Sequence, residues 1–434
     1  MLLVCVCSAV VSVGSSSPSD AMGHAHEADV PLLLVIIGWQ RPHSMARLTN
    51  SILSSEYSAS CKVDIQFALD ATHNKTMDNE MDHVVEELRS AWPRGRVSVR
   101  RRLRHAGLRD NVLGAWVPAS NDSVPAVFLE DDIELSPLWY HYVQSSLRRY
   151  GDHDHALAGQ LVGISLFTPD DMNEAFMNGH ATDRRSGRPR PSCAWQGAHA
   201  RATSDASAAV GGPASAVLFG QPCSWGALFF ARAWRHFLRH AGPLRRLQPR
   251  GLPLIPCPVS ARDEDPDHRC TQVVANRWGS SSWKRLLALH MVAHGQYMVY
   301  PNLPGRHSFA TNHVEQGVHV RSEAVLAAQR VRHRVPLVTR EWCTSVQMLC
   351  DADEKGGAFE LPNIENIRLF DFYCSLQPRS EAGLEALRNA GAPLLNRMPP
   401  PAATLEDVAA ELRPQEAFVS YADQGSRRDV HDEL

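Results

Sequence analysis

Long apolar runs are scarce in this chain. After the first twenty residues, no segment reaches the roughly 20 apolar residues that a membrane-spanning helix needs, so we expect no stable membrane span. The net charge is only −3 and no long basic stripe is present, which argues against a nucleic-acid partner. A Gly-rich phosphate loop is also absent, which disfavours a nucleotidyl- or phosphotransferase. The 434 residues, without an internal repeat, permit one large domain of about 300 residues plus a tail, or two domains.

The close cysteine spacing of a zinc ribbon or a redox motif is missing as well, because no two cysteines form a CxxC pair. Ten cysteines are present, and Cys5 and Cys7 lie in the N-terminal apolar run. The other eight form an even set, which predicts disulfides in an oxidising compartment while leaving their connectivity open. These eight are Cys61, Cys193, Cys223, Cys257, Cys270, Cys343, Cys350 and Cys374.

The two ends of the chain indicate a compartment. Residues 2–13 are mostly apolar and residues 14–19 are small and polar, which is typical of a secretory signal peptide, here expected at 1–20. The run has no Lys or Arg before it, so a short membrane anchor is the alternative. Residues 431–434 read HDEL, the address by which a retrieval receptor returns proteins to the endoplasmic reticulum. Together the ends predict the lumen of the endoplasmic reticulum.

Strand and helix patterns alternate through the first half of the chain. A continuous apolar run predicts a buried strand, strict alternation predicts a second one, and Ser44 is expected to cap the first helix. The expected strands are 31–37, 63–69, 97–99 and 126–129, and the expected helices are 44–52, 77–88, 108–116 and one starting at 137. This order predicts an α/β fold with a mostly parallel sheet flanked by helices. Ligands of such sheets bind beyond the carboxyl ends of the strands, where Arg41, Asp70 and Asp132 lie.

After the signal peptide we expect the chain to form three regions. A main domain covers residues 30–320, and within it residues 170–215, rich in Gly, Ser, Arg and Ala, are expected to be a loop or insertion. Residues 321–397 are predicted to be a less regular C-terminal extension. Residues 398–434 are expected to be a tail with one short helix.

The strongest chemical signal is the acidic triplet Glu130, Asp131 and Asp132 at the end of a buried strand. A divalent cation held by one or two carboxylates can neutralise the charge of a departing diphosphate, and Mn²⁺ or Mg²⁺ prefers such oxygen ligands. The alternative is a solvated acidic turn. The buried strand before the triplet, and the Ser-Pro helix start at residues 136–137, favour the metal site.

Residues 128–140 resemble the metal-binding segment of the GT-A glycosyltransferases, above all N-acetylglucosaminyltransferase I and its relatives. The resemblance covers about residues 31–320 and implies a GT-A (Rossmann-like) fold. It implies that Asp132 contacts the cation, with Glu130 and Asp131 beside it at the donor. Residues 107–111, 223–227, 282–285 and 311–313 are similar to a group of uncharacterised eukaryotic nucleotide-diphospho-sugar transferases.

The same resemblance suggests a nucleotide site. Arg41 matches an Arg that meets the nucleotide, and Asp70 matches an Asp that reads the uracil ring. His105 and Arg109 resemble a basic segment that lies over the donor. A UDP-sugar is therefore the expected donor.

One departure from the family leaves the catalytic base open. The family carries paired acids between two tryptophans, but residues 278–283 here read WGSSSW, and serine cannot serve as an unassisted base near neutral pH. Either the base lies elsewhere, the mechanism differs, or the enzyme is inactive. His313 and Glu315 are the nearest candidates for the base; His313 or His319 is alternatively a late metal ligand, or an ordinary loop histidine.

We therefore predict metal-dependent transfer of a sugar from a nucleotide sugar to a glycan or glycoprotein acceptor. Trp225, in the segment 223–227, is expected to form a wall of the acceptor site, whereas Cys223 is expected to pack in the core. The alternative is a catalytically inactive transferase fold that acts as a lectin-like or chaperone-associated module. Metal-dependent nucleotide binding separates the two.

Overall fold

The computed structural model describes most of the chain from residue 29 to residue 420. The described residues are 29–72, 74–151, 159–168, 215–247, 251–256, 273–279, 282–315, 327, 330, 333–346, 359, 361–373, 376–378, 381–413 and 416–420. The predicted signal peptide, residues 170–214 of the predicted insertion, and the HDEL tetrapeptide lie outside them.

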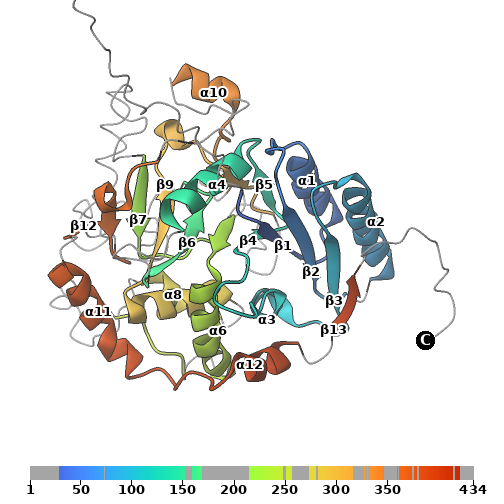
Figure 1. Ribbon diagram of the computed structural model, residues 1–434. Helices are drawn as coiled ribbons and strands as arrows, with labels where there is room; N and C mark the ends of the chain where they lie inside the picture. Colours follow the sequence, from blue (N-terminus) through green and yellow to red (C-terminus); the bar gives the residue numbers. More distant parts are fainter. Residues whose placement is uncertain are drawn as a thin grey trace, which may run out of the picture.

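A twisted eleven-stranded sheet forms the centre of the molecule (Figure 1), with the strand order β12-β11-β7-β9-β6-β8-β4-β1-β2-β3-β13. The strands are β1 (Leu32–Gly38), β2 (Val63–Leu69), β3 (Val97–Arg102), β4 (Ala126–Glu130), β6 (Leu161–Ser165), β7 (Ala216–Phe219), β8 (Ala227–Phe229), β9 (Tyr297–Pro301), β11 (Arg368–Phe370), β12 (Leu376–Gln377) and β13 (Glu416–Ser420).

Most of these strands point the same way. β1 pairs in parallel with β2 and with β4, and β2 pairs in parallel with β3. β8 lies antiparallel between β4 and β6, so that β6 and its parallel neighbour β9 run in the direction of β4. β7, β11 and β13 run the other way. The predicted fold class, α/β with a mostly parallel sheet flanked by helices, is confirmed, and it is consistent with a GT-A (Rossmann-like) fold.

The helices of the first half begin close to where the sequence predicts them. They are α1 (Pro42–Leu53), α2 (Lys75–Ala91), α3 (Gly107–Ala115) and α4 (Trp139–Tyr150). The Asn74 side chain caps α2 by accepting hydrogen bonds from the amides of Thr76 and Met77. The expectation for Ser44 was wrong: α1 begins two residues earlier, with Pro42 at its first position, because proline already has helical φ there and needs no amide partner.

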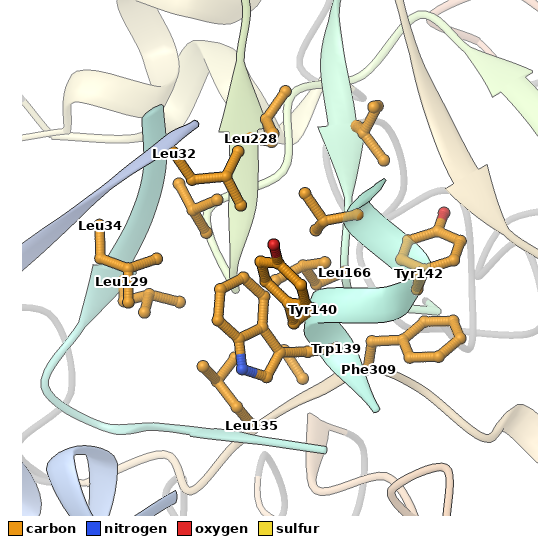
Figure 2. Close-up of a cluster of buried hydrophobic side chains, with 14 of the residues drawn as sticks. Leu32, Leu34, Leu129, Leu135, Trp139, Tyr140, Tyr142, Leu166, Leu228 and Phe309 are labelled. Carbon is orange, nitrogen blue, oxygen red and sulfur yellow. The ribbon is translucent and has the colours of Figure 1, made fainter. Parts of the chain in front are cut away.

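Two apolar cores lie on the two faces of the sheet, because successive side chains of a strand point to opposite sides. Leu32, Leu34 and Ile36 of β1 belong to one core, with α1, α2 and α4, and Val35 and Ile37 belong to the other. Figure 2 shows part of the first core, where aromatic side chains of α4 lie against leucines of β1 and β4. The second core packs against α3, α6 (Ala231–Arg246) and α8 (Trp283–His294).

A small second sheet lies beside the end of β4. It pairs β5 (Ile133–Leu135) with β10 (Ala310–Asn312) in antiparallel register, with Asn312 opposite Ile133 and Thr311 opposite Glu134. Phe309, just before β10, stacks on Tyr142 of α4 with ring centroids 4.0 Å apart and is fully buried (Figure 2). This packing fixes residues 310–313 next to the acidic triplet.

The C-terminal part of the chain is built into the main sheet. β11 pairs with β7, and β13 pairs with β3 at the opposite edge. The remaining helices are α10 (Arg340–Ser345), α11 (Glu381–Leu395), which packs on α8, and α12 (Leu405–Leu412), which packs on α6 and α3. The regions predicted as an extension (321–397) and a tail (398–434) thus both supply sheet strands, while their boundaries stay predictions.

Cys61 is unpaired. It is buried and free, so the expectation of disulfides was wrong for this cysteine. The reason is its position, because Cys61 lies in the core on one face of the sheet. Within the described part of the chain, none of the helices has the length and apolar character to cross a membrane.

Candidate functional site

Three predicted site positions meet because three neighbouring parallel strands end together. Gly38, the last residue of β1, is in register with Leu69 of β2, and Ile37 is in register with Glu130 of β4. The amide of Asp70 donates a hydrogen bond of 3.1 Å to the carbonyl of Gly38. The residues that follow each strand therefore share one edge of the sheet, as the sequence predicts.

Arg41 and Asp131 form a two-point ion pair at this edge. Nε of Arg41 donates to Oδ2 of Asp131 at 3.1 Å, and Nη2 donates to Oδ1. The amide of Trp39 also donates to Asp131, which is only 2% exposed. Gln40 between them has φ of 55°, a left-handed conformation that lets the chain turn back toward β4. Asp131 thus anchors the turn after β1 rather than facing solvent.

Asp132 keeps unused acceptor capacity. Its Oδ1 accepts a hydrogen bond from Nδ2 of Asn312 at 3.2 Å, and its Oδ2 accepts from Nη1 of Arg41 at 3.3 Å. A carboxylate has about four lone-pair positions, so these contacts occupy half of them. Asp132 therefore has acceptor positions to offer a divalent cation, since such ions take one or two protein carboxylates and complete their shell with water and phosphate. Its role as the ligand of Mn²⁺ or Mg²⁺ stays a prediction.

The charges at the site perturb one another. Burial raises the pKa of Glu130 to about 8, and the neighbouring carboxylates of Asp132 and Asp131 add to the rise, while Arg41 opposes it. Burial alone would lower the pKa of Arg41, but the carboxylates of Asp131 and Asp132 raise it above its usual value. A second cation would relieve the repulsion among these carboxylates, which is a reason for this cluster to bind one.

Glu130 also reaches the segment in which the sequence lacks an acid. Nε1 of Trp283, at the start of α8, donates to Oε1 of Glu130 at 3.4 Å. A carboxylate from the end of β4 therefore contacts one end of the segment 278–283, which itself contains no acid. The sequence did not reveal this contact, because the two residues are 153 positions apart.

Asp70 is fully engaged within the protein. Its Oδ1 accepts from the amides of Ala71 and Ala106, both at 2.9 Å, and its Oδ2 accepts from the amide of Gly107 at 2.8 Å. Nδ1 of His105 lies 3.0 Å from the same Oδ2. Asp70 thus holds the segment before α3, and a direct contact to a nucleobase would have to replace one of these bonds.

Two aromatic rings, those of Trp39 and His105, lie near Asp70. The rings of Trp39 and His105 lie with centroids 4.9 Å apart and tilted by 33°, and both residues are partly exposed. Arg109 is placed differently: its Nε donates to Asp110 at 2.9 Å, and Asp110 also accepts from Arg245 of α6. The structure brings His105 to the site and ties Arg109 into an ion pair on α3.

His313 is paired with Glu134 beside the triplet. Its amide donates to the carbonyl of Asp132 at 2.9 Å, and its Nε2 lies 2.5 Å from Oε2 of Glu134. The hydrogen bond from His313 lowers the pKa of Glu134, so the carboxylate accepts and Nε2 carries the proton. In the neutral ring with the proton on Nε2, Nδ1 carries the lone pair that a general base requires.

The backbone after His313 is strained. Val314 has φ of 47°, which is an outlier for a β-branched residue, and its amide donates to Oδ1 of Asn312. Asn312 therefore links this turn to Asp132. Strain of this kind persists only where the surroundings enforce it, and it is concentrated at functional sites.

Glu315, the other predicted catalytic residue, points to α1. Its carboxylate accepts from the hydroxyl of Ser44 and from Nη2 of Arg47. Burial opposes ionisation, but these two partners lower the pKa of Glu315. A paired carboxylate of lowered pKa is a weaker base, so His313 is the better placed of the two candidates. The predicted alternative ligand His319 lies outside the described residues.

The aromatic wall predicted around Trp225 is partly exposed. Nζ of Lys284 lies 4.5 Å from the centroid of the Trp225 ring and 5.3 Å from that of Trp278. Phe167 meets Trp225 edge-on, with centroids 4.8 Å apart. Cys223 is buried in the core, as predicted.

Comparisons with known proteins add little to this geometry. No protein-family profile and no curated protein matches the chain. Among solved structures it is similar to TarS of S. aureus, with 11% identity, 36% of this chain and 23% of that chain covered, and a TM-score of 0.24. It is also similar to the galactosyltransferase LgtC in complex with donor and acceptor sugar analogues, with 10% identity, 47% of this chain and 59% of that chain covered, and a TM-score of 0.23. Both scores are low, and the chain spans 23% and 59% of the lengths of these two structures.

Proposed function

We propose that the protein is a GT-A glycosyltransferase that moves a sugar from a nucleotide sugar, a UDP-sugar, to a glycan or glycoprotein acceptor. The observation that carries the proposal is the position of Asp132. It follows β4 at the carboxyl edge of the sheet, keeps free acceptor capacity, and lies between Arg41 and Asn312. The resemblance of residues 128–140 to the metal-binding segment of this class points the same way.

The donor end of the site combines acidic and basic groups. Asp132, with Glu130 behind it, would hold Mn²⁺ or Mg²⁺, which when bound stabilises the negative charge of the leaving diphosphate. Arg41 is held in place by Asp131, and its Nη1 lies at the same edge beside Asp132, where it would pair with the diphosphate. Asp70 and His105 position the segment before α3, and the Trp39–His105 pair offers a flat surface on which a uracil ring can stack.

The acceptor end relies on His313. Nδ1 of His313 accepts the proton of the acceptor hydroxyl as that oxygen attacks the sugar, and Glu134 stabilises the imidazolium that forms. Trp225 and Trp278, bridged by Lys284, supply aromatic faces for a sugar ring. This arrangement replaces the acid that residues 278–283 lack.

The test is a thermal-shift and calorimetric screen of nucleotide sugars with and without Mn²⁺. A donor that binds the folded protein raises the melting temperature, and at a given concentration a tighter donor raises it more. We expect a UDP-sugar to do so only with a divalent cation, and to be consumed when an acceptor glycan is added. Donor binding without turnover, or glycan binding without any donor binding, would instead support an inactive lectin-like or chaperone-associated module.

The location is a separate part of the proposal and rests on residues 431–434. A receptor reads this address only at the C-terminus. Adding residues after Leu434 should release the protein from the endoplasmic reticulum into the medium. Full retention of the extended protein would show that another feature sets its location.

A further inference from the structure

Four histidines meet between α6 and α8, away from the acidic triplet. They are His236 and His240 on α6 and His290 and His294 on α8, and we call them the histidine cluster. On each helix the two residues are four positions apart, which places both side chains on one face. Their ligand atoms all lie within 4.8 Å of one another, and the ring centroids are 4.3 to 4.9 Å apart in every pair.

Hydrogen bonds fix the proton position in two of the rings. Nδ1 of His240 lies 3.0 Å from the carbonyl of His236, and Nδ1 of His294 lies 2.9 Å from the carbonyl of His290. A carbonyl oxygen only accepts, so Nδ1 carries the proton in both rings and Nε2 carries the lone pair. Histidines that bind metals are oriented by the same device, in which one nitrogen donates to a carbonyl and the other is the ligand.

His290 provides the second, independent observation. Its side chain is fully buried, and neither Nδ1 nor Nε2 has a hydrogen-bond partner within the described part of the chain. A buried polar group without a partner is costly and rare in folded proteins. A metal ion at the centre of the cluster would satisfy one of these nitrogens directly.

Burial also disfavours the protonated form of these four rings. Burial lowers the pKa of His290 and of its three neighbours, and the positive charges of Arg239 and Arg232 add to the effect on His236. Neutral imidazole is the form that binds metal ions.

We infer that the histidine cluster binds one divalent transition-metal ion of the Zn²⁺ type, as a structural site that joins α6 to α8. Imidazole nitrogen suits Zn²⁺ and Co²⁺, whereas Mn²⁺ and Mg²⁺ prefer oxygen ligands. A tetrahedral site with Zn–N bonds of about 2.0–2.1 Å places its nitrogens roughly 3.3 Å apart. The ligand atoms lie within 4.8 Å of one another, so binding requires the side chains to rotate inward by the remaining distance. Four protein ligands leave no open position, which is the mark of a structural rather than a catalytic site.

The location separates this site from the donor site. A cavity of about 590 Å³ lies against His236 and is lined by the start of β6 and the residue before β9. β6 and β9 run in the direction of β4, so this cavity is at the amino edge of the sheet, opposite the acidic triplet. His236 is the exposed member of the cluster, and the cavity gives a metal ion access to it.

The test uses the full chain purified without a histidine tag and stripped with EDTA. We expect one equivalent of Zn²⁺ to survive dialysis, Co²⁺ to give the intense visible absorption of tetrahedral coordination, and Zn²⁺ to raise the melting temperature. The His236→Gln variant, changed at the exposed position, should weaken Zn²⁺ binding by more than the roughly 10- to 100-fold that loss of an outer partner costs. The double variant His236→Gln/His294→Gln should bind none.

His83→Gln is the matched control, since this histidine is exposed on α2 and distant from the cluster. It should bind Zn²⁺ like the unchanged protein. Asp132→Asn should also retain the Zn²⁺ site, which keeps this result independent of the donor site. If the unchanged protein binds Zn²⁺ and Co²⁺ no more tightly than the folded double variant does, the inference is wrong.

Discussion

The Arg41 guanidinium binds the Asp131 carboxylate through Nε and Nη2, while its Nη1 reaches Asp132. One arginine therefore pairs with Asp131 and also approaches Asp132, the carboxylate that we propose binds the cation. The two aspartates, although adjacent in sequence, have different contacts, and they should respond differently to the same substitution.

Asp132→Asn should abolish metal-dependent donor binding and leave the fold intact. The amide has the size of the carboxylate and can keep its contact with Asn312, but it lacks the charge that holds a divalent cation. Losing one carboxylate from a site with only one or two should cost several kcal/mol, on the order of 3, in metal binding. Calorimetry with a UDP-sugar and Mn²⁺ measures the loss, and Glu87→Gln, an exposed carboxylate on α2, is the charge control. If the Asn variant still binds the donor with full Mn²⁺ dependence, the triplet is not the metal site.

Asp131→Asn should instead lower stability. Asn keeps one acceptor for Arg41 but removes the charge, and Asp131 accounts for two of the three bonds that this partly buried arginine makes to the triplet. We expect the free energy of unfolding to fall by about 1–3 kcal/mol, between the values of surface and buried ion pairs. Denaturant titration measures it. An unchanged midpoint would mean that the ion pair does not anchor the turn after β1.

Glu315→Gln distinguishes an anchor from a base. The ion pair with Arg47 lowers the pKa of Glu315, so its stabilisation is present above the unfolded pKa of about 4.3 and is lost as the pH falls through the lower folded value. The variant should therefore have a lower melting temperature than the unchanged protein at neutral pH. Its free energy of unfolding should fall by about 1 kcal/mol or less, because the pair is partly exposed. The difference between the two melting curves should shrink as the pH falls below about 4.3 and vanish below the lower folded pKa. A variant that melts normally at pH 7 but loses turnover would make Glu315 the base.

His313→Gln should reduce turnover and spare donor binding. General-base catalysis contributes about 10²- to 10⁴-fold, so kcat should fall by at least about 100-fold while the donor Kd is unchanged. Glu134→Gln should have a smaller effect of the same kind, since Glu134 orients His313 and stabilises its charged form. Turnover assays with calorimetry separate the two quantities. Equal losses of donor binding and turnover would point to a metal-ligand role for His313.

Gly226→Ala should disturb the site through β10. Gly226 has φ of 80°, and a Cβ there would lie 2.9 Å from Cβ of Ala310. Gly107 has nearly the same φ of 78° but open space around it, so Gly107→Ala is a matched control that pays only the backbone cost of about 1–2 kcal/mol. Gly226→Ala should cost about 1–3 kcal/mol more, as overpacking does, and should weaken donor binding. If both variants lose the same free energy of unfolding in denaturant titrations, β10 shifts to accommodate the new methyl group without cost.

The sequence predicts the parts of the site that follow strands. Apolar runs locate β1 and β4, and parallel strands that neighbour each other must end at the same edge, so Arg41 and Asp132 could be placed together. The partners that complete the site come from far along the chain. Asn312 and Trp283 reach the triplet only through β10 and α8, and neither contact has a local sequence signal.

The histidine cluster is a different case. The His-x-x-x-His spacing is present twice in the sequence, at 236–240 and at 290–294, and each spacing indicates one helix face. What the sequence does not contain is the packing of α6 on α8, which turns two ordinary pairs into one site. Asp70 is the opposite case, because its position after β2 is predicted from the sequence but its availability for a ligand is not. Its carboxylate oxygens accept hydrogen bonds from the backbone at the start of α3.

The pairing of β13 with β3 has a consequence for synthesis of the chain. Glu416 pairs with Arg102, which lies 314 positions earlier in the chain. A ribosome adds about 5–20 residues per second, so the open edge of β3 waits roughly 15–60 s for its last strand. Throughout that interval β3 offers unpaired amides and carbonyls to any other nascent chain. The edge of β3 is thus the place at which we expect folding helpers to be needed while the protein is being made.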